Sequence, residues 1–309
     1  MPYFRHDGVD LHYLERGRGR PVVLIHGLGM CGGDWAFHVP ALETHYRVIL
    51  PDLRGSGRSS RPRGRYSIPQ FARDMWALLD HLGIDSADLV GFSLGGAVAL
   101  EMSLQRPERV PRLVTINSLA SYRPDHWRKW LEARVQTLLV RWGGMPRTAR
   151  LVAARVFPEP WQAALRERAI TVIGATPPRP YLATVAALER WSCVRRLGRL
   201  RTRTLIVAAE HDYTPLEEKR ELAVHLDAEF VVVRGSRHGT PFDAIRATNA
   251  CIGAFLQDAP LPAPEDCRLD TPEDVPREPP PGSVAQEHAA AAPPGAAEVA
   301  GASVPARAA

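Results

Sequence analysis

The stretch Gly91-Phe-Ser93-Leu-Gly95 has the pattern G-x-S-x-G and lies between a predicted strand, 89–90, and a predicted helix, 95–105. A serine on such a sharp turn has a strained backbone, and glycines two places away let the strand and helix pass closely. The turn lifts the hydroxyl to the carboxyl end of the sheet, where ligands bind in open α/β folds. The alternative is an incidental serine in a glycine-rich turn. Because the pentapeptide joins a strand to a helix, we interpret Ser93 as a nucleophile.

Apolar runs and helical patterns alternate on both sides of this turn. Two short strands at 3–5 and 11–14 flank an Asp-Gly turn, which is a common hairpin signal. Apolar runs typical of strands in parallel sheets follow at 21–25, 48–50, 89–90, 113–116, 204–208 and 230–233. Helical spacing predicts helices at 68–82, 95–105, 216–226 and 242–256. This alternation predicts an α/β fold, with a mostly parallel sheet covered by helices on both faces.

Two segments depart from the alternation. Residues 121–198 have a helical pattern interrupted by prolines, and they contain five of the seven tryptophans. We expect them to form an inserted helical cap on a core made of residues 1–120 and 199–258. Residues 259–309 are rich in Pro, Ala and Glu and poor in large apolar residues. Such a segment buries too little surface to offset chain entropy, so we predict a disordered acidic tail.

The motifs of the chain together resemble the α/β-hydrolase fold family, in its lidded esterase and lactonase branch. The resemblance covers residues 3–258 and rests on the pentapeptide together with His26-Gly-Leu28-Gly, Asp52-Leu-Arg54-Gly-Ser-Gly57, Glu210-His-Asp212 and Gly235-Ser-Arg-His238. These motifs are specific for the family and poor guides to the substrate. Two positions depart from the family pattern: Ala209 stands where many relatives have glycine, and Arg237 precedes the histidine where glycine is common. Neither departure removes a catalytic group.

A serine hydroxyl is a weak nucleophile and needs an adjacent base. Histidine suits this role because it takes and returns a proton near pH 7. Of the eleven histidines, His238 lies in a loop of small residues after the last predicted strand, in the chain order Ser, Asp, His expected for this fold. His26, whose position in the family packs under the oxyanion loop, and His211 are the alternatives.

The acid that orients the histidine should follow a strand between Ser93 and His238. Asp212 does so directly, and it would hold the imidazole tautomer and stabilise the imidazolium. Glu210, two residues away, is a rival, whereas Asp243 follows the histidine and would break the order. Some relatives carry the acid after the preceding strand, but Asn117-Ser118 supplies no carboxylate there.

Acyl transfer also needs donors for a developing oxyanion. By position, the backbone N–H groups of Leu28 and Leu94 would supply them. We interpret the motif containing Asp52, Arg54 and Gly57 as structural. Direct catalysis is the alternative, since its loop is expected to lie beside the active site.

The composition narrows the expected partners. The net charge is +5, but all except two of the 39 basic residues are arginine, which indicates a bias of the whole chain rather than a nucleic-acid surface. No apolar run is long enough to span a membrane, and the amino terminus does not resemble a secretory signal. The four scattered cysteines are typical of free thiols in a reducing compartment, so we expect a cytoplasmic protein without stable membrane insertion. The oligomeric state stays open.

The resemblance implies hydrolysis of a carboxylic ester, thioester or lactone through an acyl-enzyme, on a small-molecule substrate and with no metal or cofactor. A carbon–carbon bond hydrolase of aromatic degradation shares the same motifs, and a ligand receptor that keeps the triad is a third hypothesis. The nucleophilic serine argues against haloalkane dehalogenases and epoxide hydrolases, whose relatives carry aspartate there. In one interpretation, the tryptophans of the cap anchor it on the core and its arginines face solvent. In the other, the tryptophans line an apolar substrate pocket and the arginines form its cationic rim.

Overall fold

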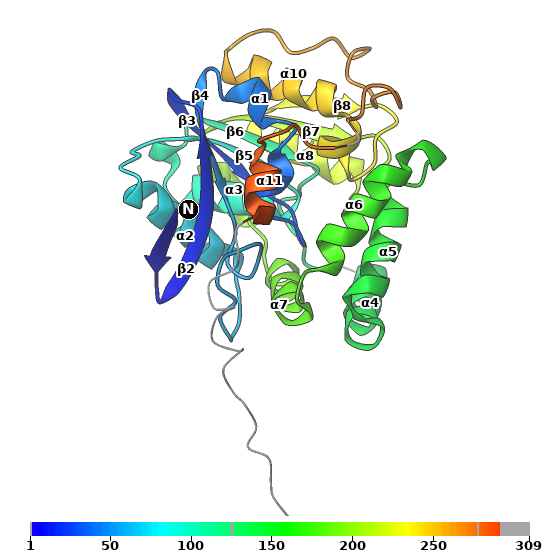
Figure 1. The fold of residues 1–309 in the computed structure, drawn as a ribbon. Coiled ribbons are helices and arrows are strands. Elements are labelled where there is room, and N and C mark those ends of the chain that lie inside the picture. Colours follow the sequence, from blue (N-terminus) through cyan, green and yellow to red (C-terminus); the bar gives the residue numbers. More distant parts are fainter. Residues whose placement is uncertain (1, 125–126, 277, 291–309) are drawn as a thin grey trace, which may run out of the picture.

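The computed structural model describes residues 2–124, 127–276 and 278–290. Eight strands form one sheet in the order β1-β2-β4-β3-β5-β6-β7-β8 (Figure 1). The antiparallel pairs are β1 (Tyr3–His6) with β2 (Val9–Arg16), and β2 with β4 (Tyr46–Pro51). All other neighbours are parallel, and they include β3 (Arg20–Ile25), β5 (Asp88–Phe92), β6 (Arg112–Ile116), β7 (Arg203–Ala209) and β8 (Glu229–Val233). The predicted α/β class with a mostly parallel sheet is confirmed.

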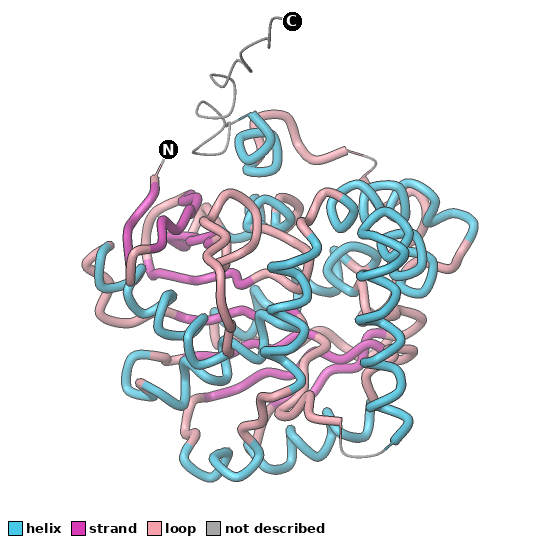
Figure 2. Tube along the Cα trace, turned by 90° about the horizontal axis from the view of Figure 1, so that it is seen from below, coloured by secondary structure: helices cyan, strands magenta, loops and turns pink. Residues whose placement is uncertain are grey.

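Successive residues of the central strands enter two different cores, because side chains alternate across a sheet. On β3, Val23 and Ile25 join the core under α2 (Ile68–His81), α3 (Leu94–Gln105) and α8 (Leu216–Leu226). Val22 and Leu24 join the opposite core under α1 (Val39–Leu42) and α10 (Ile245–Leu256). Both faces of the sheet are therefore covered by helices (Figure 2). The predicted helix 242–256 is split, because the backbone of Ala244 is not helical and separates α9 (Thr240–Asp243) from α10.

An inserted helical segment lies between β6 and β7. It contains α4 (Trp127–Leu138), the π-helix η3 (Leu139–Gly143), α5 (Gly144–Val156), α6 (Ala163–Gly174) and α7 (Pro178–Glu189). Figure 1 shows α4, α5 and α6 on the side of the molecule away from β1 and β2. The remaining short helical turns are η1 (Gly32–Trp35), η2 (Pro107–Arg109), η4 (Pro160–Gln162) and η5 (Val194–Arg199).

The two ends of the inserted segment run side by side. Ser121 and Ser192 form an antiparallel bridge, and the Cys193 N–H donates to the carbonyl of Ala120 at 2.8 Å. Trp191, at the same place, is buried and its indole N–H donates to Glu101 at 2.8 Å. The insert therefore leaves and re-enters the core at one narrow neck.

The prediction of disorder from residue 259 onward is wrong for 259–276 and 278–290, which the structure places against the core; residues 291–309 lie outside the described residues. The Asp270 carboxylate accepts the Ile245 N–H at 2.6 Å and so caps the amino end of α10. Cys267 is buried in the core beside α10, and Val284 begins α11 (Val284–Ala290), which packs on η1. A few anchoring residues thus hold a segment whose average composition favours disorder.

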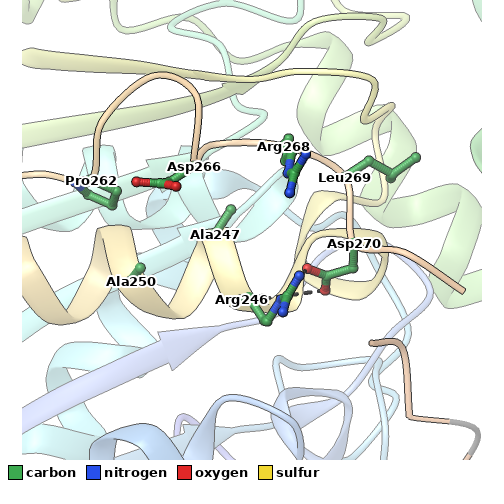
Figure 3. A pocket seen from close by; sticks show the side chains of 8 residues that line it. All are labelled: Arg246, Ala247, Ala250, Pro262, Asp266, Arg268, Leu269 and Asp270. Atoms are coloured by element: carbon green, nitrogen blue, oxygen red, sulfur yellow. Dashed lines mark hydrogen bonds and ion pairs between the residues drawn. The ribbon is translucent and has the colours of Figure 1, made fainter. Parts of the chain in front are cut away.

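Figure 3 shows where this carboxy-terminal segment crosses α10. Asp270 also pairs with the Arg246 side chain at 3.5 Å, and a cavity of about 340 Å³ remains between the segment and the helix. Cys251 of α10 and Cys267 of the segment are hydrogen-bonded through their side chains, and burial raises the pKa of both thiols. None of the four cysteines, all of which lie within the described residues, forms a disulfide.

Candidate active site

Ser93 occupies the turn between β5 and α3 with φ 52° and ψ −113°. Non-glycine residues rarely adopt such a backbone, and it costs on the order of 1–3 kcal/mol. The turn is possible because its glycines have no side chain: a Cβ on Gly95 would strike the Ile25 carbonyl, and one on Gly91 would strike the Gly95 backbone. The Ser93 N–H donates to the Ile116 carbonyl at 2.9 Å, which fixes the turn against β6. These contacts therefore enforce the strained turn and hold the serine hydroxyl at the carboxyl edge of the sheet.

Ser93, His238 and Asp212 form a chain of hydrogen bonds. The Nε2 atom of His238 lies 2.9 Å from Ser93 Oγ, and its Nδ1 atom lies 2.8 Å from Asp212 Oδ1. Ser93 follows β5, Asp212 follows β7 and His238 follows β8. The carboxyl ends of these parallel strands therefore bring the three residues together. Because a carboxylate only accepts, the neutral imidazole donates from Nδ1 and leaves Nε2 free to accept the serine proton.

Asp212 is held as a carboxylate by its surroundings. Its side chain is fully buried, and its Oδ2 atom accepts hydrogen bonds from Thr214 Oγ1 and from Lys219 Nζ. Burial alone would raise the pKa of Asp212, but the adjacent His238 and Lys219 outweigh it and hold that pKa well below its usual value. The sequence did not single out Lys219, although it is one of only two lysines and follows Asp212 by seven residues.

Asn117 fastens the loop that carries His238. It follows β6 and has a left-handed backbone, with φ 49°. Its Nδ2 donates to the His238 carbonyl at 3.0 Å and to Thr240 Oγ1 at 2.8 Å, while its Oδ1 accepts the Ala209 N–H at 2.7 Å. Nothing in the local sequence indicates this positioning role for Asn117, because its partners come from distant segments.

The alternatives weighed for the base and acid lie elsewhere. Glu210 is exposed and accepts the Gly235 N–H at 2.8 Å, and His211 is also exposed. His26 is buried, where its Nε2 accepts the Leu53 N–H at 3.1 Å. Asp243 is buried and accepts the Ser236 hydroxyl at 2.7 Å; burial raises its pKa to about 7. The hydrogen bonds described here join none of these four side chains to Ser93.

The motif with Asp52, Arg54 and Gly57 makes contacts of a structural kind. Asp52 is buried and accepts the backbone N–H groups of Gly32 at 2.7 Å and of Arg58 at 2.9 Å. The Arg54 guanidinium binds the buried Asp74 carboxylate through two hydrogen bonds of 2.5 Å. A Cβ on Gly57 would strike the Asp52 carboxylate. These contacts hold the loop after β4 in one shape.

A cavity of about 660 Å³ opens above Ser93 and His238. The core and the inserted segment both line it, mostly with apolar side chains, among them Leu28, Met30, Phe92, Leu119, Leu139, Val152, Val156, Phe157, Val172, Ile173, Tyr181 and Phe242. Its charged lining residues are Asp34, Arg123, Arg155, Arg168 and Glu189. The cavity can therefore hold an apolar group beside the serine hydroxyl, with a few charges to orient a polar one.

The tryptophans of the inserted segment do not take part in this cavity. Among the described residues that line it there is no tryptophan, and Trp127, Trp130 and Trp142 are exposed. Only Trp191 is buried as an anchor, and Trp161 is half-buried. Neither interpretation offered from the sequence covers all five side chains, because the apolar lining consists of aliphatic, phenylalanine and tyrosine side chains.

Aromatic rings surround the histidine within the cavity. The Tyr213 ring packs on His238 with 4.2 Å between centroids, and the Arg155 guanidinium lies 4.7 Å from the centroid of Tyr213.

Leu28, in the loop after β3, also lines the cavity, and Leu94 is the first residue of α3. The Leu94 N–H therefore belongs to the first turn of α3, where N–H groups have no acceptor within their own helix.

No group of three or more His, Cys, Asp or Glu side chains in the described ranges is arranged to hold a metal ion. The helices of those same ranges are all too short or too polar to cross a bilayer.

The comparisons with known proteins agree on one family. The family model described as "alpha/beta hydrolase fold" matches residues 20–244. RutD of Azorhizobium caulinodans, assigned as a carbamate hydrolase, is 33% identical over 218 residues, which are 69% of this chain and 81% of RutD. The enol-lactonase of Burkholderia xenovorans superposes with a TM-score of 0.77 and 26% identity, over 83% of this chain and 100% of the lactonase. A thermophilic esterase from Thermogutta terrifontis gives 0.74 and 26%, over 83% and 96% of the two chains.

Proposed function

Since the chain belongs to the α/β-hydrolase family, we propose that it is a serine hydrolase that cleaves a carboxylic ester, thioester or lactone through an acyl-enzyme. The observation that carries this proposal is the chain of hydrogen bonds from Ser93 Oγ through His238 to Asp212 at the floor of an apolar cavity. A hydroxyl bonded to an imidazole, which is in turn bonded to a buried carboxylate, is the arrangement that activates serine.

The proposed reaction has two halves. Ser93 Oγ attacks the substrate carbonyl carbon while His238 Nε2 takes the hydroxyl proton, and Asp212 stabilises the imidazolium through Nδ1–H. The oxygen of the tetrahedral intermediate accepts the N–H groups of Leu28 and Leu94. The intermediate collapses when His238 returns its proton to the leaving alcohol or thiol. A water molecule then attacks the acyl-enzyme by the same route, which releases the acid and restores Ser93.

The cavity indicates which part of the substrate is recognised. Its mostly apolar lining suits an acyl chain or a ring, because burial of each methylene contributes about 0.8 kcal/mol. Arg155 and Arg168 lie among this apolar lining, and they would orient a carbonyl or carboxylate distant from the reacting bond. Among the similar proteins, two are named as a lactonase and an esterase, and RutD is named as a carbamate hydrolase, so all three names refer to hydrolysis at an acyl carbon.

A fluorophosphonate probe tests the nucleophile. We expect it to label Ser93 with one equivalent, and we expect Ser93→Ala to abolish both labelling and turnover. Ser121→Ala is the matched control, because Ser121 also lines the cavity and lies outside the chain of hydrogen bonds. Peptide mapping that places the label on another serine would refute the assignment.

A substrate panel separates the proposed activity from its alternatives. Nitrophenyl esters, acyl thioesters and lactones should be turned over. The nitrophenyl esters should also give a burst of nitrophenol equal to the enzyme concentration. Cleavage confined to vinylogous diketones would indicate the carbon–carbon hydrolase instead. Extremely slow turnover of every compound, together with tight ligand binding, would indicate a receptor.

A further inference from the structure

The inserted segment carries an apolar stripe on its outer surface. Trp127, Leu131, Val135, Leu138 and Trp142 recur every three or four residues along α4 and η3, which places them on one helical face. Trp142 is 86% exposed and Trp127 68%, and the other three are exposed to about half. We refer to these five residues as the α4 stripe. Exposed apolar surface that is continuous over several helical turns is a mark of an interaction site.

The surroundings of the stripe are strongly basic. From residue 127 to 156 the sequence has seven basic residues and a single acidic one, Glu132. Arg134, Arg141 and Arg150 are exposed, and the Arg134 guanidinium lies 5.4 Å from the centroid of the Trp130 ring. A helix with an apolar face that contains tryptophan and with a basic polar face is typical of segments that lie in the interface of an anionic bilayer.

The positive charge around the stripe also indicates which of two partners covers it, a second copy of this chain or an anionic surface. In a symmetric dimer the same patch of each subunit meets its own copy. Two basic segments would then face one another, and like charges destabilise such a contact. An anionic surface is instead complementary to the arginines. The observations therefore favour a bilayer with anionic headgroups over a second copy of this chain.

The stripe is continuous with the cavity of the candidate active site. Leu131 and Val135 belong to the stripe and also line that cavity, which extends to Ser93. In Figure 1, α4 lies at the outer edge of the inserted segment, beside α5. A surface that covers the stripe would thus lie next to the cavity that extends to Ser93.

We propose that the α4 stripe adsorbs to anionic phospholipid bilayers, and that an apolar acyl substrate passes from the lipid into the cavity along Leu131 and Val135. Adsorption depends on the stripe alone, whereas delivery of the substrate rests on the proposed hydrolase function. Tryptophan suits the role because its ring is apolar while its N–H remains in contact with headgroups or water. The stripe lies along the bilayer surface and does not cross it.

Sedimentation with vesicles tests adsorption separately from hydrolysis, if the full chain carries Ser93→Ala. Vesicles of phosphatidylcholine with about 30% phosphatidylglycerol should bind the protein, and pure phosphatidylcholine should bind it far more weakly. Binding should decline in about 1 M salt, where the screening length is about 3 Å. Replacing both tryptophans, Trp127→Gln with Trp142→Gln, should lower the partition coefficient by about tenfold or more.

The control is Val224→Gln, which removes an equally exposed apolar residue, on α8 and outside the stripe. It should leave binding unchanged, and equal melting temperatures should show that all variants fold. The proposal is overturned if neither vesicle binds, if the tryptophan and Val224 variants bind alike, or if sedimentation velocity without lipid finds a dimer that the tryptophan changes dissociate. If vesicles bind while the active chain hydrolyses no ester, the proposed function fails and the adsorption stands.

Discussion

Lys219→Met removes the cation from a buried ion pair with Asp212. Lys219 and Asp212 are both fully buried at the side chain, and Lys219 also donates to the Thr214 carbonyl at 3.2 Å. Removing one partner of a buried pair costs on the order of 3 kcal/mol, because the other charge stays in the interior. For a domain of this size, with an unfolding entropy of about 2.1 cal/mol/K per residue, that loss lowers the melting temperature by about 5 °C.

The loss should depend on pH in a defined direction. The pKa of Asp212 in the folded protein lies below its unfolded value, so its ionisation stabilises the fold above about pH 4 and ceases to do so as the pH falls toward the folded pKa. The variant should therefore be less stable than the wild type at pH 7, and the difference should shrink as the pH falls below about 4. Calorimetry across this range measures the effect.

The same change should alter the pH profile of activity. Lys219 and His238 bind the two oxygens of one carboxylate, so removing the lysine leaves more negative charge facing the imidazole. That charge favours the imidazolium, so the acid limb of the pH profile of kcat/KM should move to higher pH. Lys129→Met, which changes the only other lysine, is the control. Equal melting temperatures and an unmoved acid limb for Lys219→Met would refute the reasoning.

Three further changes test other parts of the structure. Asp212→Asn should keep the fold and lower kcat by about 10⁴-fold, whereas Glu210→Gln should have little effect; steady-state kinetics that reverse this order would exchange the two roles. Truncation after Asp258 removes the Asp270 carboxylate that caps α10 at Ile245, a cap worth about 1 kcal/mol, so the melting temperature should fall by about 2 °C or more, and an unchanged melting temperature would disprove the docking. Extending the acyl chain of a nitrophenyl ester by two carbons should raise kcat/KM by about tenfold until the cavity is full; a flat response would show that the acyl chain stays outside it.

Local sequence patterns were sufficient to identify the three residues whose side chains form the chain of hydrogen bonds in the site. Ser93 was found from a five-residue pattern, and Asp212 and His238 from their places directly after predicted strands, because the carboxyl ends of parallel strands meet at one edge. The strands themselves follow from apolar runs that fill both cores.

The residues that support the site could not be found in this way. Asn117 and Lys219 act through contacts with segments that only the folded sheet brings near, and nothing in their own sequence neighbourhoods indicates those partners. Asp270 is likewise a single useful carboxylate within a Pro- and Ala-rich stretch. The exposure of Trp142 depends on which face of an inserted helix turns outward, which periodicity alone does not determine.

The neck at Ser121 and Ser192 has a consequence for how the protein can diversify. Because both ends of the inserted segment are joined there, the intervening residues behave as one long loop whose closure changes by only about 0.6 kcal/mol for each doubling of length. The segment is therefore an exchangeable cassette. Evolution or engineering can replace it with another set of helices, and so change the molecules that reach Ser93, without altering the hydrogen bonds of the sheet.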